Sequence, residues 1–104
     1  MIEILKNNPI FLTAAIAEAM KDRKTAGYVG RCMERFCSGD FGDICREDTT
    51  FNLEQIARKE GRALGAYGAF GFLQEPIFII AEFSCVNPCD LDMNHTTVLY
   101  RFEY

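Results

Sequence analysis

The segment Ile77-Phe78-Ile79-Ile80-Ala81-Glu82-Phe83 decides the fold class of this chain. It is an apolar run of strand length with a single glutamate, and the turn residues Gln74-Glu75-Pro76 precede it. Such a run is typical of a strand in the interior of a sheet. We therefore expect a central strand over residues 77–83.

Two further stretches have the two-residue period of strands. Residues 62–73 alternate between two faces, although three glycines weaken this strand and suggest a bulge. Residues 96–103 alternate in the same way. A short turn and a long polar connection over 84–95 join the three strands in chain order, which predicts an antiparallel meander.

The chain before residue 61 has the helical period instead, and three helices are expected there. The first covers residues 10–23, and the second is capped by Thr25 and ends at Gly39. The second is the clearest, because one face carries the apolar residues Tyr28, Val29, Cys32, Met33, Phe36 and Cys37. The third helix lies within residues 48–60.

The third helix has two candidate N-caps. Asn52, with Gln55 three residues later, matches a capping box, and Asp48 is the rival for an earlier start. The residues of this helix expected to face the core are Leu53, Ile56 and Ala57. Helices followed by strands predict a single α+β domain of residues 1–104, with three helices packed on one face of a three-stranded antiparallel sheet.

The composition excludes several classes of protein. With 104 residues, of which 49% are hydrophobic and 25% charged, the chain can bury one core and is unlike disordered or fibrous proteins. A net charge of −4 argues against coating nucleic acid, and no stretch approaches the ~20 apolar residues of a membrane helix. Residues 9–17 have the outline of a secretory signal, but Glu3 and Glu18 flank them, so a cytoplasmic protein is expected.

The five cysteines also favour a reducing compartment. Their number is odd, so they cannot all pair within one chain, and free thiols are expected. A zinc site would combine Cys85, Cys89 and His95 with Cys37 or Cys45. Because a single C-x-x-x-C is weak evidence for zinc, no metal or other cofactor is expected.

Two acidic stretches resemble cation sites. One group could supply oxygen ligands to Mg²⁺ or Ca²⁺, namely Asp40, Asp43, Glu47 and Asp48. The interpretation that these side chains cap helices and close turns is favoured, because short polar side chains readily bind free backbone N–H groups. Residues 90–94 begin like a calcium loop, but His95 and Arg101 replace its required glycine and glutamate, so a polar hairpin loop is expected.

Several short motifs follow one another from residue 36 onward. They are Ser38-Gly39-Asp40-Phe41-Gly42-Asp43, Glu47-Asp48, Asn52, Arg62-Ala63-Leu64-Gly65-Ala66-Tyr67, Phe78-Ile79-Ile80-Ala81-Glu82 and Thr96-Thr97-Val98-Leu99-Tyr100-Arg101-Phe102-Glu103-Tyr104. In order and spacing they resemble the motifs of a family of small hypothetical proteins from bacterial plasmids, phages and integrated elements, often called plasmid-related proteins. Phe41 and Phe78 stand where the family pattern has tryptophan, and a longer 83–94 segment replaces its short hairpin.

The resemblance implies a shared fold and an association with mobile elements, without an established activity. It singles out candidates for a binding site or a polar structural network, namely Ser38, Asp40, Asp43, Glu47, Asp48, Asn52, Arg62, Tyr67, Glu82, Thr96 and Thr97. The first functional hypothesis is a mobile-element accessory protein that binds another protein, such as a host-defence, replication or regulatory component. The alternative is a small metal-dependent or carboxylate-based hydrolase built on Asp40, Asp43, Glu47, Asp48 and Glu82.

The expected partner is thus a protein, and neither nucleic acid nor a membrane is expected. A homodimer is a further expectation, because the terminal strand over 96–103 could be an open sheet edge that pairs across two copies.

Overall fold

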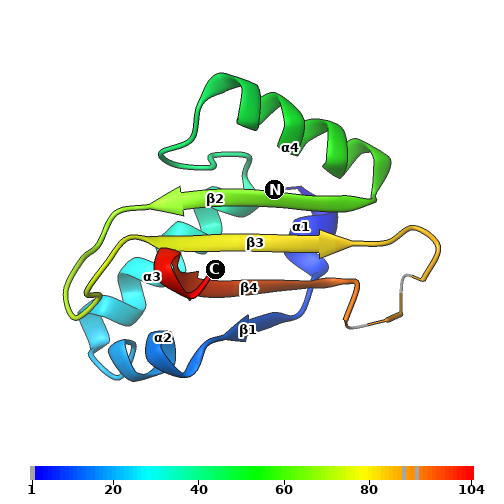
Figure 1. Cartoon of the computed structure of the whole chain (residues 1–104). Helices are drawn as coiled ribbons and strands as arrows, with labels where there is room; N and C mark the ends of the chain where they lie inside the picture. Colours follow the sequence, from blue (N-terminus) through cyan, green and yellow to red (C-terminus); the bar gives the residue numbers. More distant parts are fainter. Residues whose placement is uncertain (1, 88, 91) are drawn as a thin grey trace.

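Figure 1 shows the computed structural model, which describes residues 2–87, 89–90 and 92–104. Its strands form one sheet in the order β1-β4-β3-β2 and comprise β1 Ile10–Leu12, β2 Gly61–Tyr67, β3 Ile77–Phe83 and β4 His95–Tyr100. The helices are α1 Glu3–Asn7, α2 Ala14–Ala19, α3 Arg23–Cys37, α4 Arg46–Arg58 and the short 3₁₀ helix η1 Arg101–Glu103. The predicted α+β class is confirmed, but the described residues form four α-helices where three were expected.

The predicted central strand is also confirmed. β3 pairs antiparallel with β2 on one side and with β4 on the other. One face of β3 is buried in the core through Ile77, Ile79 and Ala81, and the opposite face carries Phe78, Ile80 and Glu82. The three strands of the predicted meander are therefore present, in the predicted chain order.

A fourth strand makes the sheet mixed, which corrects the expectation of three antiparallel strands. Residues Ile10–Leu12 pair parallel with β4, where the periodicity predicts a helix over 10–23. The side chain of Thr13 accepts the N–H of Ile16 and so caps α2, which places the start of the helix after these three residues. The predicted helix is therefore a strand followed by α2 and the start of α3.

The pairing of β3 explains why the other strands are shorter than predicted. Its first residue, Ile77, pairs with Tyr67 of β2 and with Tyr100 of β4, so neither neighbour has a partner beyond these positions. Residues 68–73 consequently form a loop, and residues 101–103 turn into η1. β4 lies between β1 and β3, which corrects the expectation that the terminal strand is an open edge.

α4 begins before both predicted caps. Its first residue is Arg46, so Asn52 lies in the middle of the helix and the capping-box prediction is wrong. Leu53 and Ala57 are exposed, and of the three residues expected to face inward only Ile56 packs against the core. The reason is that α4 lies along β2 at the edge of the sheet (Figure 1), where a helix buries only a narrow stripe.

The core lies between the sheet and the N-terminal helices α1, α2 and α3 (Figure 1). Phe36 of α3 is fully buried in it, next to Gly65 of β2. A Cβ at Gly65 would lie 2.9 Å from a ring carbon of Phe36, so this glycine lets the ring approach the strand backbone. No helix of the described residues has the length and apolar character needed to cross a membrane.

Candidate functional site

A row of polar side chains crosses the sheet on the face opposite the core. Arg62 of β2 pairs in register with Glu82 of β3, and Glu82 pairs with His95 of β4. The guanidinium of Arg62 donates to Glu82 Oε1 at 3.2 Å, and Nε2 of His95 lies 3.1 Å from Glu82 Oε2. Both oxygens of this carboxylate are therefore engaged, which makes it the centre of a cross-strand network.

The C-terminal residues lie over the same face. Arg62 donates a second hydrogen bond to the hydroxyl of Tyr104 at 2.7 Å, and the ring of Tyr104 meets that of Phe78 edge to face. A cavity of about 210 Å³ lies here, and Thr97 and Glu103 are among its lining residues. Arg62 thus joins the sheet to the chain after β4.

Asn52 closes the outer edge of β2. Its side-chain amide donates to the carbonyl of Leu64 at 2.8 Å and accepts the N–H of the same residue at 3.1 Å. The loop after α3 binds Ala66, the next residue of β2 whose backbone groups face outward. The N–H of Ala66 donates to the carbonyl of Phe41, and the carbonyl of Ala66 accepts the N–H of Asp43. This part of β2 is therefore sealed against a further strand.

Among the four acidic residues from Asp40 to Asp48, Asp40 has a structural role. Asp40 binds Arg35 at 2.7 Å and accepts the N–H of Gly42, and these two contacts lower the pKa of its carboxyl group. The backbone carbonyl of Asp40 accepts the hydroxyl of buried Tyr67, which ties the loop after α3 to the end of β2. Burial is the main cause of the raised pKa of Tyr67.

The remaining predicted residues do not gather into one cluster with Asp40 and Glu82. Asp43, Glu47 and Asp48 are exposed, the last two in the first turn of α4, where negative charge favours the helix dipole. Asp48 also lines a cavity of about 230 Å³ beside Asn52 and Arg62. Thr96 is fully buried, and its hydroxyl has no hydrogen-bond partner among the described residues.

The structure bears on the metal and thiol expectations only within the described residues. There, no three histidine, cysteine or acidic side chains lie together in a way that could hold a metal ion. The five cysteines are unpaired: Cys32 and Cys37 are buried, and Cys45, Cys85 and Cys89 are exposed. The hydrolase hypothesis stays a prediction, with Glu82 and His95 in contact while Asp40 is bound to Arg35.

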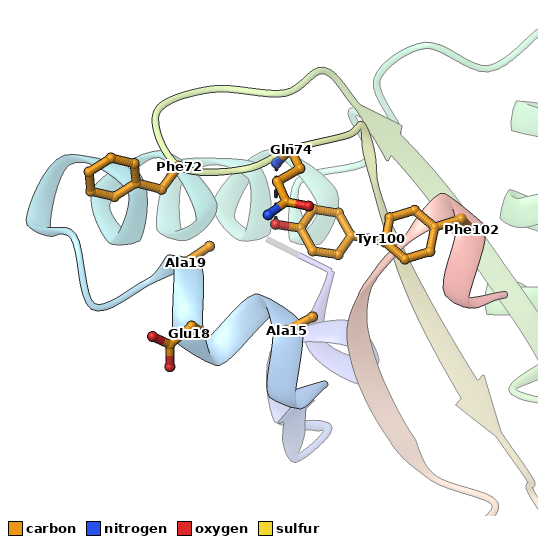
Figure 2. A pocket seen from close by; sticks show the side chains of 7 residues that line it. All are labelled: Ala15, Glu18, Ala19, Phe72, Gln74, Tyr100 and Phe102. Carbon is orange, nitrogen blue, oxygen red and sulfur yellow. Dashed lines mark hydrogen bonds between the residues drawn. The ribbon is translucent and has the colours of Figure 1, made fainter.

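A surface groove lies on another part of the molecule, between α2, the loop after β2 and η1 (Figure 2). It has a volume of about 480 Å³. Ala15 and Ala19 of α2 line it with small side chains, while Phe72 and Phe102 stand at its two ends in Figure 2. Phe72 is 67% exposed and Phe102 is 66% exposed.

Tyr100 lies between Phe72 and Phe102 in the lining of this groove (Figure 2). It is buried, its hydroxyl accepts the N–H of Gln74 at 3.3 Å (Figure 2), and its ring stacks on Phe102 with centroids 5.1 Å apart. The loop wall is tied to α3 because the N–H of Phe72 donates to the hydroxyl of Thr25 at 2.9 Å. The groove is therefore built on ordered elements although its aromatic ends are exposed.

The sequence pattern did not indicate this groove. It assigned Phe72 and Phe102 to alternating strand positions, and exposure of an aromatic side chain is visible only after the strand ends are known. The one signal available was the number of aromatic residues in the two segments that flank the central strand.

Comparisons with protein-family models, curated proteins and solved structures found no match to this chain.

Proposed function

We propose that this protein acts by binding another protein, and that the groove between α2 and η1 receives an apolar side chain of that partner. The observation that carries the proposal is the exposure of Phe72 and Phe102 at the ends of one groove. Exposed aromatic side chains beside a pocket are the usual anchors of protein interfaces, because they bury a large area with few rotamers to order.

The alanines of α2 support the same use. Ala15 and Ala19 leave a hollow of about 480 Å³ between the rings, and such a hollow accommodates an aliphatic or aromatic side chain. Glu18, the charged residue that lines the groove, already binds Lys21 at 2.8 Å. The small and aromatic side chains that line the groove suit an apolar group. A mobile-element setting, which the motif resemblance implies, belongs to the same proposal.

Photo-crosslinking tests this function at single positions. We would replace Phe72 or Phe102 with p-benzoylphenylalanine and irradiate the protein in a bacterial lysate. Phe51 of α4 is the matched control, because it is an aromatic residue with a comparable exposure of 51% outside the groove. We expect one crosslinked partner from both groove positions and none of that mass from position 51.

A loss-of-binding experiment then uses the partner so identified. The double change Phe72→Ala with Phe102→Ala should weaken its binding by about 30-fold or more, as expected for two interface anchors. Phe51→Ala should leave binding unchanged. Equal crosslinking from all three positions, or a double variant that binds as well as the parent protein, would overturn the proposed function.

A further inference from the structure

The two edges of the sheet differ in what covers them. At β2 the backbone groups of Leu64 and Ala66 that face outward are bound by Asn52 and by the loop after α3. At β1, by contrast, all three residues of the strand are exposed, by 52% at Ile10, 45% at Phe11 and 40% at Leu12. The sheet can therefore grow at β1 and is blocked over these positions of β2.

The direction of the β1 hydrogen bonds shows which groups are available. The carbonyl of Pro9 accepts the N–H of Thr96, and the N–H of Thr13 donates to Val98, so the odd-numbered residues face β4. Backbone groups alternate in direction along a strand, and those of Ile10 and Leu12 therefore point toward the open edge. These donors and acceptors are what an added strand needs.

This edge is complementary to itself. In an antiparallel pair centred on Phe11, Ile10 lies opposite Leu12 of the partner subunit, and each such hydrogen-bonded pair exchanges both of its N–H···O=C bonds. The side chains that meet are all apolar. No charged residue occurs between Lys6 and Glu18, so the strand and its flanks lack the charges that usually keep sheet edges apart.

We propose that β1 pairs antiparallel with β1 of a second copy of this chain about a two-fold axis at Phe11, giving one continuous sheet across the dimer. The β1 edge is distinct from the groove of the proposed function, and either proposal can fail without the other. A three-residue strand buries little area, so we expect a weak dimer with a dissociation constant on the order of 10–100 µM.

Sedimentation equilibrium over protein concentrations from about 1 µM to about 1 mM tests the dimer. The average mass should rise from that of one chain toward that of two. Leu12→Pro removes an N–H that points to the open edge and leaves the bonds of Phe11 and Thr13 to β4, so it should keep the fold and weaken the dimer more than tenfold. Circular dichroism checks the fold.

A second pair of variants remains informative if the proline variant fails to fold. Phe11→Lys places like charges opposite each other at the two-fold axis and should abolish the dimer, whereas Phe51→Lys introduces the same charge on α4 and should leave the mass unchanged. A single-chain mass at every concentration for the parent protein would overturn the proposal. So would a folded Phe11→Lys protein that still dimerises.

Disulfide trapping locates the axis. With the exposed Cys45, Cys85 and Cys89 replaced by serine, Phe11→Cys should form a disulfide-linked dimer in oxidised glutathione, because the residues at the axis face each other across a closely spaced pair. Phe51→Cys in the same background is the control. A dimer that crosslinks equally through both positions would contradict pairing at β1.

Discussion

At the scale of single residues, two buried threonines have opposite relations to their surroundings. Thr25 is fully buried, donates its hydroxyl to Asp22 at 2.8 Å and accepts the N–H of Phe72 at 2.9 Å. Thr96 is equally buried but its hydroxyl is unpaired among the described residues. The same side chain therefore ties a loop to α3 in one place and buries an unsatisfied polar group in the other.

Replacing each threonine with valine should accordingly change stability in opposite directions. Thr25→Val leaves the N–H of Phe72 without an acceptor and should lower the free energy of unfolding by about 1–2 kcal/mol. Thr96→Val keeps the shape and removes the unpaired hydroxyl, so it should raise the free energy of unfolding by about 1 kcal/mol. Urea denaturation measures both, and two changes of the same sign would contradict this assignment.

At the scale of elements, the end of α3 is held against the end of β2 by a cluster that contains the charged pair of Arg35 and Asp40. The carboxylate of Asp40 binds Arg35 in the last turn of α3, and its backbone carbonyl accepts the hydroxyl of Tyr67 at the end of β2. The ring of Tyr67 also lies below the Arg35 guanidinium, with 5.1 Å from the guanidinium carbon to the ring centroid. This cluster holds the loop that seals the edge of β2.

The Arg35 contact makes part of the stability depend on pH. It lowers the pKa of Asp40 in the folded protein, so its contribution is complete above the unfolded pKa and is lost as pH falls through the folded one. Asp40→Asn should therefore cost about 0.5–1 kcal/mol at pH 6 and nothing near pH 2, because exposed pairs contribute little.

Denaturation of both proteins across this pH range measures the difference. Asp43→Asn removes the same charge from the same loop without touching Arg35, and it should not reproduce the loss. A cost of Asp40→Asn that is equal at pH 6 and pH 2 would show that the Arg35 pair is not its source.

At the scale of the whole molecule, the arrangement of the two sheet edges determines what the protein can assemble into. α4 follows β2 along its length (Figure 1), and Asn52 provides the backbone-like amide that completes the edge. A sheet with one sealed and one open edge forms a closed pair, whereas a sheet with two open edges can form longer assemblies.

Asn52→Leu tests this role. It leaves both the N–H and the carbonyl of Leu64 without their partner, so it should lower the free energy of unfolding by about 2–3 kcal/mol. It should also produce species larger than a dimer at high concentration, which light scattering detects. Glu54→Leu, an exposed change on the same helix, should alter stability by less than about 0.5 kcal/mol. Equal behaviour of the two variants would mean that Asn52 does not seal the edge.

Much of the fold was predictable because its strongest signals are local. The apolar run of β3 and the one-sided pattern of α3 each depend on residues close together in the chain, and both elements were predicted, although α3 begins at Arg23 with Asp22 rather than Thr25 as its N-cap. The short strand β1 was not, because three residues carry too little periodicity and gain their structure only by pairing with β4, more than eighty residues later in the chain.

The same distinction between local signals and distant partners applies to the candidate site residues. From the sequence, the motif resemblance singled out Arg62, Glu82 and Asn52 as candidates for a site or a polar network without placing them relative to one another. Only the tertiary structure decided that Arg62 and Glu82 meet across two strands, that Asn52 completes an edge, and that Phe72 and Phe102 bound one groove. The physical reason is that strand pairing and exposure depend on partners distant in the chain, whereas helical and strand periods are properties of neighbouring residues.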